Sequence, residues 1–183
     1  MVLCPLLLYI GARIKREDGG PVFYRGVRVG LRGKPFRIYK FRTMVVDAEK
    51  MGPSSTAEED PRITRIGKWT RKHKLDELPQ LLNVFVGDMS FVGPRPQVEW
   101  AVDLYTPEEK AILAVRPGIT DYASLRFSNE AEILKGSEDP DKVYMEKIHP
   151  EKMRLALEYV QNHSIVIDLR LILMTVGKVL WRG

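Results

Sequence analysis

The sequence predicts an α+β fold that is predominantly α-helical and contains one small β-hairpin. Three observations lead to this prediction. Two neighbouring segments, 22–30 and 35–44, are rich in β-branched and aromatic residues, as strands are. Several later segments carry helix signals, such as proline or acidic starts and glycine stops. The composition is that of a folded chain, with 44% hydrophobic and 29% charged residues.

The N-terminal segment 1–12 is an apolar run, followed at once by three basic residues, Arg13, Lys15 and Arg16. This run is too short to span a bilayer, which needs roughly 20 residues, and Pro5 would bend or break a helix within it. Two interpretations remain open. The run is either a buried core helix or a segment that dips into one leaflet, with the basic residues at the headgroups.

The next segments form the expected hairpin. Residues 19–21 mark a turn, after which the two strands follow. On the second strand Phe36, Ile38, Lys40 and Arg42 share one face, which is not cleanly amphipathic. Two interpretations of this face remain open. It binds a ligand or a membrane, or it is a solvated strand face. Residues 51–61 form a polar loop.

Helices dominate the remainder of the prediction. A basic helix covers 63–74, and a second helix runs from 75 to about 87 with Pro79 in its first turn. Residues 92–96 form a stiff extended loop, 97–115 are helical with a new start at 106, and 116–118 form a rigid turn. Helices then cover 150–162 and 165–180. The last is apolar but interrupted by charges, so it lies on a membrane or closes the core.

Charge distribution indicates an anionic partner. The net charge is +5, and residues 1–46 carry ten Lys or Arg against two acidic residues. Nucleic acid is the poorer candidate, because aromatic residues do not interleave with the basic ones. A single cysteine, Cys4, excludes an intramolecular disulfide and a Cys-rich zinc site, and the three histidines lack metal-binding spacing. Both facts fit a reducing compartment.

The pair Asp76-Glu77 is the most suggestive candidate for chemistry. Placed at the start of the second helix, both carboxylates meet free backbone N–H groups that favour their ionised forms. An ionised aspartate can act as a nucleophile, and a neighbouring carboxylate can hold Mg²⁺. Plain helix capping is the alternative interpretation.

Several basic residues are candidates for binding phosphate. Arg95 lies between two prolines and Arg116 precedes one, so a rigid backbone pre-organises both for bidentate contact. Arg71 lies just upstream of the acidic pair. Lys40 and Arg42 add positive charge from the hairpin. Surface salt bridges are the alternative for each arginine. The residues alone therefore indicate a metal-assisted, phosphate-handling site near a membrane.

Four segments resemble the bacterial sugar transferase family, whose members are monotopic polyprenyl-phosphate phosphoglycosyl transferases. They are PRITRIGKWTRKHK and LDELPQLLNVFVGDMSFVGPRP over 61–96, KFRTM at 40–44 and RPGIT at 116–120. The resemblance covers nearly the whole chain. Enzymes of this family start the assembly of exopolysaccharide, capsule, O-antigen or glycoprotein glycans. The chain departs from the pattern at Asp121-Tyr122, where many members have Gly-Trp.

The resemblance implies a reaction and the residues for it. Asp76 would attack the β-phosphate of a UDP-sugar, expel UMP and carry the phosphosugar until polyprenyl phosphate, such as undecaprenyl phosphate, accepts it. Glu77 would hold the Mg²⁺ cofactor together with Asp76. Arg71 and Arg95 match family arginines near the phosphates, and Lys40 and Arg116 are weaker matches.

The resemblance also implies how the protein is attached to the membrane and where in the cell it works. Residues 1–18 would be the second half of a re-entrant membrane helix that is kinked at Pro5, with its first half missing. Residues 19–183 would be the catalytic domain, with amphipathic helices on the membrane surface. The expected location is the cytoplasmic face of the bacterial inner membrane. The sequence leaves a homo-oligomer open.

Two alternatives to the enzyme remain. One is a non-catalytic module that binds acidic lipid or another polyanion through its basic face. The other is an inactive truncated relative, which the short N-terminus favours. Asp76→Asn separates the first from the enzyme, because a binding module would tolerate this change.

Overall fold

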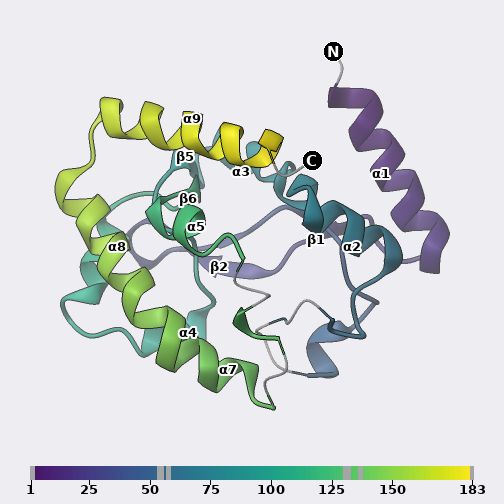
Figure 1. Ribbon diagram of the computed structural model, residues 1–183, viewed down its shortest axis with the longest axis horizontal. Coiled ribbons are helices and arrows are strands. Elements are labelled where there is room, and N and C mark those ends of the chain that lie inside the picture. Colours follow the sequence, from purple (N-terminus) through teal and green to yellow (C-terminus); the bar gives the residue numbers. More distant parts are fainter. Residues whose placement is uncertain (1–2, 53–55, 57–58, 130–132, 136–137, 182–183) are drawn as a thin grey trace.

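The computed structural model describes residues 3–52, 56, 59–129, 133–135 and 138–181. Most of the elements in these ranges are helices, which surround three small two-stranded sheets (Figure 1). The predicted α+β class is therefore confirmed. The predicted polar loop at 51–61 lies partly outside the described residues.

Helix α1 spans Leu3–Asp18 and has one packed face. Ile10 and Ile14 are buried against Phe41 and Ile66, whereas Leu8 on the outer face is 71% exposed. Pro5 lies in the first turn, where its missing N–H leaves no hydrogen bond unmade. The kink at Pro5 therefore stays a prediction. No helix in the described ranges has both the length and the apolar content needed to cross a membrane.

The predicted hairpin is present but is divided into two short ladders. Strand β1 (Phe23–Tyr24) pairs antiparallel with β4 (Lys40–Phe41), and β2 (Val27–Val29) pairs with β3 (Pro35–Arg37). A 3₁₀ turn η1 (Leu31–Gly33) joins the inner strands. Its middle residue, Arg32, has a φ of 56°, in the left-handed region. Lys40 is the first residue of β4, the last strand of the hairpin.

After a bridge between Met44 and Ile63 and a 3₁₀ turn η2 (Ala48–Lys50), the basic helix α2 spans Arg65–Lys72. The hydroxyl of Thr64 caps it by accepting the N–H of Gly67 at 3.1 Å. The prediction of one helix from residue 75 was wrong. A 3₁₀ turn η3 (Leu75–Glu77) comes first, and α3 (Gln80–Phe85) begins after Pro79.

Strands β5 (Ser90–Val92) and β6 (Gly118–Thr120) form a parallel pair that the sequence did not predict. The pairing brings the loop after β5 against the turn before β6. A Cβ added at Gly118 would lie 2.1 Å from the nitrogen of Gly93, so only glycine allows this approach. Of the loop predicted over 92–96, Val92 lies in β5, and residues 93–96 are confirmed as a loop because the chain from 93 to 98 contains no helix or strand. The stiffness of the loop stays a prediction.

The segment predicted as helical over 97–115 consists of two short helices, α4 (Glu99–Asp103) and the 3₁₀ helix η4 (Glu109–Ala114). The new start predicted at Thr106 is confirmed, since its hydroxyl and the Glu109 carboxylate accept each other's backbone N–H groups. Helices α5 (Tyr122–Arg126), α7 (Pro140–Val143) and the π-helix η5 (Tyr144–Ile148) follow. The two predicted C-terminal helices are α8 (His149–Asn162) and α9 (Ile165–Trp181).

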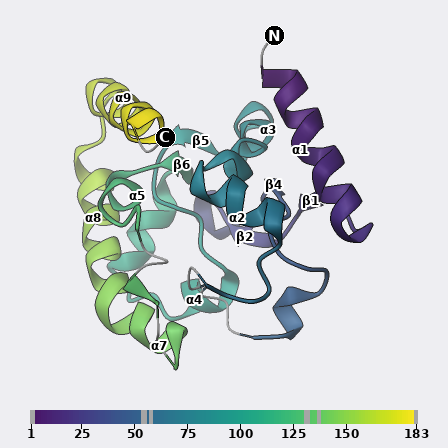
Figure 2. The same cartoon turned by 45° about the vertical axis from the view of Figure 1, so that its right-hand side comes forward.

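One end of the molecule carries many exposed apolar side chains. Helices α9 and α3 lie along this end, to which α1 also points with its N-terminus, whereas α4 and α7 lie at the opposite end (Figures 1 and 2). We call the exposed apolar residues of α9, of α3 with the residue that follows it, and of β5 the apolar surface: Leu81, Leu82, Phe85, Val86, Phe91, Ile165, Val166, Leu169, Leu173, Met174, Val176 and Val179. Phe85 is 89% exposed. Exposed apolar patches of this kind on folded domains are typical of surfaces that bind a membrane or another protein.

Candidate active site

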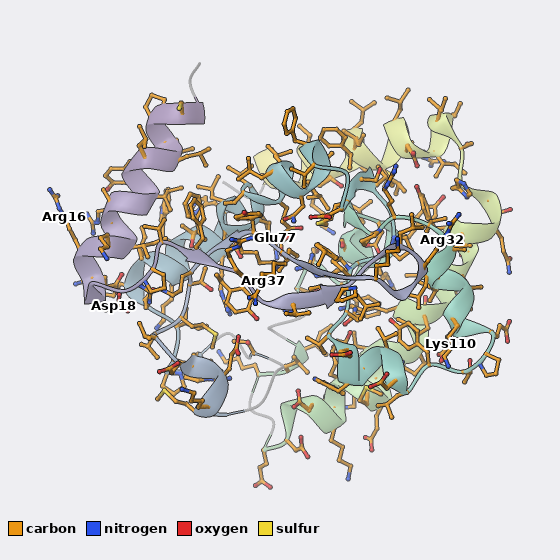
Figure 3. All side chains as sticks on the ribbon, turned by 180° about the vertical axis from the view of Figure 1, so that it is seen from behind. Arg16, Asp18, Arg32, Arg37, Glu77 and Lys110 are labelled. Atoms are coloured by element: carbon orange, nitrogen blue, oxygen red, sulfur yellow. The ribbon has the colours of Figure 1, made fainter. Side chains whose placement is uncertain are left out.

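The acidic pair lies in the turn η3, between the end of α2 and the start of α3. Lys74, with a φ of 56°, reverses the chain after α2. Figure 3 shows Glu77 in the middle of the molecule, between the hairpin and the helices. Asp76 is 9% exposed. The pair therefore does not cap a helix at the surface, and it faces the interior.

Glu77 joins three parts of the chain. Its carboxylate accepts a hydrogen bond from the Lys40 ammonium group on β4 at 2.9 Å. It also accepts two from the guanidinium group of Arg95, one of them at 3.2 Å. The predicted site residues Lys40, Arg95 and Glu77 are thus brought together.

These contacts shift the pKa values of the cluster. Burial by itself would raise the pKa of Glu77, but the charges and hydrogen bonds of Arg95 and Lys40 outweigh it and hold that pKa well below the ordinary value. Burial lowers the pKa of Lys40, and the negative charge of Glu77 opposes this shift. Glu77 is therefore ionised and electrically balanced by two cations.

Asp76 differs from its neighbour. Its Oδ1 atom is buried and has no hydrogen-bond partner among the described residues. Burial raises the pKa of Asp76, the charge of Glu77 raises it further, and the nearby cations, chiefly Lys40 and Arg71, oppose both effects. The prediction that a helix start favours the ionised form of Asp76 was wrong, because burial and a neighbouring carboxylate dominate.

Arg71 completes the positive charge around Asp76. It lies in the last turn of α2, and its Nε atom donates to the hydroxyl of Thr43 at 2.9 Å. Burial lowers the pKa of Arg71, and the negative charge of Asp76 opposes the shift. Lys40, Arg71 and Lys74 all stabilise the Asp76 carboxylate electrostatically.

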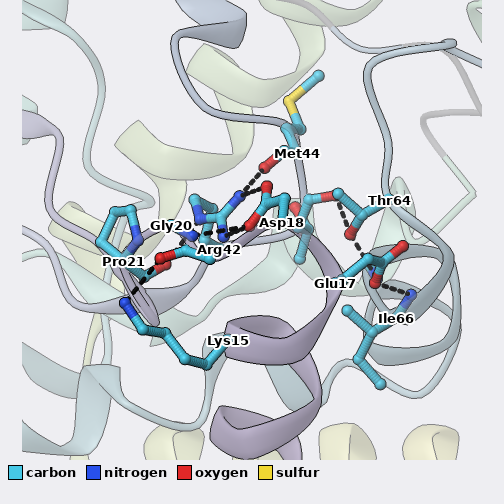
Figure 4. A network of polar contacts seen from close by, with 12 residues as sticks. Lys15, Glu17, Asp18, Gly20, Pro21, Arg42, Met44, Thr64 and Ile66 are labelled. Atoms are coloured by element: carbon cyan, nitrogen blue, oxygen red, sulfur yellow. Dashed lines mark hydrogen bonds and ion pairs between the residues drawn. The ribbon is translucent and has the colours of Figure 1, made fainter.

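Two other predicted phosphate ligands make no contact with Glu77 among the described residues. Arg42 is buried, and its guanidinium group binds both carboxylate oxygens of Asp18 and the carbonyl groups of Pro21 and Met44 (Figure 4). It therefore does not join the cluster around Glu77. Arg116 is exposed, and its side chain makes no hydrogen bond or ion pair with the described residues.

Two buried amides of α3 escaped the sequence analysis. Asn83, which is fully buried, accepts the backbone N–H of Tyr39 at 2.8 Å and donates to the carbonyl of Arg37 at 2.9 Å. It thereby fastens α3 to the hairpin beside Lys40. Gln80 is 1% exposed, and its Nε2 atom has no partner within the described ranges. The available signal was their placement, three residues apart in an otherwise apolar helix.

A magnesium ion would find two protein ligands here, Asp76 and Glu77. The described residues contain no group of three or more His, Cys, Asp or Glu side chains that could hold a metal. Mg²⁺ is commonly bound by one or two carboxylates, with substrate phosphates completing its shell. The Oδ1 of Asp76 lacks a partner in the described part of the chain and is open to such an ion. Both oxygens of Glu77 accept hydrogen bonds from Lys40 or Arg95, so Glu77 would bind the ion only in exchange for one of these contacts.

The site has the features of one that handles phosphate through a carboxylate. An unpartnered buried oxygen of Asp76 can attack phosphorus or bind metal, and the flanking cations can neutralise phosphate oxygens. The histidines and the single cysteine take no part in these contacts. A nucleophilic serine or cysteine mechanism therefore finds no support in this cluster.

Comparisons with known proteins agree with this chemistry. A family model described as bacterial sugar transferase matches residues 1–182. The "Uncharacterized sugar transferase EpsL" of Bacillus subtilis is 39% identical over 175 residues, which are 96% of this chain and 78% of the relative. The UDP-glucose:undecaprenyl-phosphate glucose-1-phosphate transferase of Caulobacter vibrioides is 37% identical, over 98% of this chain and 64% of the relative.

The Escherichia coli protein of the same name as the Caulobacter enzyme is 32% identical over 97% of this chain, which corresponds to 37% of that relative. This chain thus spans most of some relatives and a minor part of others. In each comparison nearly all of the chain, including the segments around Asp76 and Arg95, takes part. The chain belongs to the bacterial sugar transferase family.

Proposed function

We propose that this protein transfers a phosphosugar from a UDP-sugar to polyprenyl phosphate and releases UMP through a covalent intermediate on Asp76. The observation that carries the proposal is the buried Asp76 carboxylate, whose Oδ1 has no partner and which is surrounded by cations. The names of the relatives from Caulobacter vibrioides and Escherichia coli support the same overall reaction.

In the first step, Oδ1 of Asp76 attacks the β-phosphorus of the UDP-sugar. A new P–O bond forms to the carboxylate, and the bond to the bridging oxygen breaks, so that UMP leaves with the electron pair. In the second step, a phosphate oxygen of polyprenyl phosphate attacks the same phosphorus. The P–O bond to Asp76 then breaks, which restores the carboxylate and forms polyprenyl-diphosphate-sugar.

In this proposal the cations around Asp76 neutralise the charge of the substrate and keep Glu77 ionised. Arg71 and Lys40 neutralise the oxygens of the diphosphate, and so lower the repulsion that an attacking carboxylate meets. Arg95 and Lys40 leave Glu77 ionised, and Glu77 with Asp76 would hold Mg²⁺. A bound Mg²⁺ would supply charge neutralisation for the diphosphate and for UMP as leaving group.

We also propose that the protein works at the cytoplasmic face of the bacterial inner membrane. Polyprenyl phosphate is a membrane lipid, so the site must lie within its reach. The apolar surface along α9 and α3 is suited to sit among lipid headgroups, and the N-terminus of α1 points to the same end. In this proposal the N-terminal part of residues 1–18 enters the membrane without crossing it, while Ile10 and Ile14 stay packed on the body.

The test is UMP release by purified protein with Mg²⁺, polyprenyl phosphate and a panel of UDP-sugars. We expect release with one or two sugars, and none from Asp76→Asn. Without the lipid acceptor, mass spectrometry of the intact wild-type chain should show the mass of one added phosphosugar. Absence of release from every sugar would contradict the proposal. Vesicle binding retained in that case would favour the non-catalytic module.

A further inference from the structure

The last turn of α1 carries two neighbouring carboxylates, Glu17 and Asp18, that bind different elements of the body (Figure 4). Neither belongs to the cluster around Asp76. Both contacts bridge more than 20 positions in sequence. They therefore connect α1 to segments that lead into the site.

Asp18 binds the strand side of the site. Its two oxygens accept hydrogen bonds from Nη1 and Nη2 of Arg42 at 2.6 and 2.5 Å. The hydrogen bonds from Arg42 lower the pKa of Asp18, so the pair is ionic at neutral pH. Arg42 directly follows β4, and Lys40 lies two residues before it on that strand. The pair thus holds the end of the strand that presents Lys40 to Glu77.

Glu17 binds the helix side of the site. Its carboxylate accepts the backbone N–H groups of Arg65 at 2.6 Å and of Ile66 at 3.1 Å, in the first turn of α2. These N–H groups have no partner within the helix, so the carboxylate satisfies them and favours one orientation of α2. Arg71 lies in the last turn of the same helix.

Thr43 links the two sides. Its carbonyl accepts the backbone N–H of Thr64 at 3.0 Å, immediately before α2, and its hydroxyl accepts the Nε–H of Arg71. Because Thr43 follows Arg42 in the chain, a shift of Arg42 is passed on to both the strand and the helix. The two carboxylates thus act on one connected unit.

We propose that Glu17 and Asp18 are positioning residues for Lys40 and Arg71, two of the cations near the Asp76 carboxylate. Asp18 acts on Lys40 through Arg42. Glu17 acts on Arg71 through helix α2. The inference rests on the proposed phosphoglycosyl transfer. It adds that the way α1 docks on the rest of the protein determines the positions of Lys40 and Arg71 in the site.

Apolar packing holds α1 in place independently of these carboxylates. Ile10 and Ile14 are buried against Phe41 and Ile66, which none of the substitutions below removes. Loss of either carboxylate should therefore leave α1 docked but less precisely oriented. An effect on catalysis that exceeds the effect on folding is the expected signature.

The experiment measures UMP release as a function of UDP-sugar concentration for wild type, Asp18→Asn, Glu17→Gln and Arg42→Lys. Misplacement by a fraction of an ångström should lower kcat by about tenfold to a hundredfold, with a smaller change in KM. Asp18→Asn with Arg42→Lys should be no worse than the poorer single variant.

A direct role of Arg42 in binding phosphate makes a different prediction. In that case Asp18→Asn would free Arg42 and leave KM unchanged or lower it, while Arg42→Lys alone would raise KM. That pattern would overturn the inference. Matching kcat losses in the Asp18 and Arg42 variants would support it.

Met153→Ala is the control for simple destabilisation. Met153 lies in a separate core cluster with Val29, Val102 and Tyr105, so its truncation should lower Tm without lowering the kcat of the folded fraction. Activity losses in the α1 variants that only follow their folded fraction would overturn the inference. A wild-type chain that releases no UMP would instead overturn the proposed function, and this inference with it.

Discussion

Lys40 and Glu77, which are 37 residues apart in sequence, meet in an ion pair of 2.9 Å at the centre of the candidate site. Neither side chain is fully enclosed, at 19% and 18% exposure. Since Arg95 shares the same carboxylate, Glu77 holds two cations that come from the hairpin and from the loop after β5. The ion pair therefore joins the parts of the fold that must meet for phosphate chemistry.

Glu77→Gln should lower kcat for UMP release by about 10²- to 10³-fold, because both Lys40 and Arg95 lose their common anion and the metal loses a ligand. Burial lowers the pKa of Lys40, and Glu77 opposes that shift. The alkaline limb of the pH profile should therefore move to lower pH in the variant. Glu77→Asp is the control, since it keeps the charge and should show a smaller shift. An unchanged alkaline limb in Glu77→Gln would contradict this role of the carboxylate.

Asp76→Asn should abolish UMP release and yet raise Tm by a few degrees near neutral pH. The pKa of Asp76 is raised in the folded protein by burial and by Glu77, so the folded state binds the proton more tightly than the unfolded state. Stability is then lost as pH rises above the ordinary aspartate value of 3.8. An uncharged asparagine avoids this loss.

The measurement is thermal unfolding of wild type and Asp76→Asn at about pH 7 and about pH 4. The Tm advantage of the variant should shrink at the lower pH, where the wild-type carboxyl group is protonated. An advantage of equal size at both pH values would show that the buried charge is not its cause.

Gly67→Ala should destabilise the protein by about 3 kcal/mol and impair activity as well. A Cβ at this position would lie 2.0 Å from the carbonyl oxygen of Thr43, so α2 must move away from the strand and carry Arg71 with it. Gly177→Ala is the matched control. Gly177 lies in α9 with open space around it, and alanine there should stabilise by about 0.5–1 kcal/mol. Chemical denaturation of both variants tests this, and equal stabilities would refute the close contact.

Asn83→Ala should lower the free energy of unfolding by about 2–3 kcal/mol, because it leaves the buried backbone groups of Tyr39 and Arg37 without partners. Asn162→Ala removes a comparable hydrogen bond, to the carbonyl of Glu158, at an exposed position. It should cost less than about 0.5 kcal/mol. Urea titrations of the two variants give the comparison, and similar losses would argue against the locking role of Asn83.

Leu173→Glu should weaken binding to vesicles of acidic phospholipid by about tenfold to a hundredfold, since burial of one leucine contributes about 1.5–3 kcal/mol. Leu173 belongs to the apolar surface and is 71% exposed. Leu104→Glu is the matched control, because Leu104 is also largely exposed but follows α4 at the opposite end of the molecule. Flotation assays measure both. Equal losses would mean that the apolar surface is not the face that meets the lipid.

The sequence by itself was enough to predict the hairpin, the helices α8 and α9, and the acidic pair with its closest cations. Each of these predictions depends on local signals, such as strand composition or a proline that admits only one helix position. Lys40 and Arg95 were both predicted for the site, and the structure places both on Glu77. The roles of these residues in the reaction stay predictions.

Only the tertiary structure decided which charges meet. Arg42 was a candidate phosphate ligand on the same strand face as Lys40, yet it is bound by Asp18, 24 residues away. The parallel pairing of β5 with β6 joins segments of only three residues, which are too short to be recognised as strands from the sequence. The raised pKa of Asp76 depends on burial and on Glu77. Partners, pairing and desolvation are all set by segments distant in the chain, and for that reason local sequence patterns could not predict them.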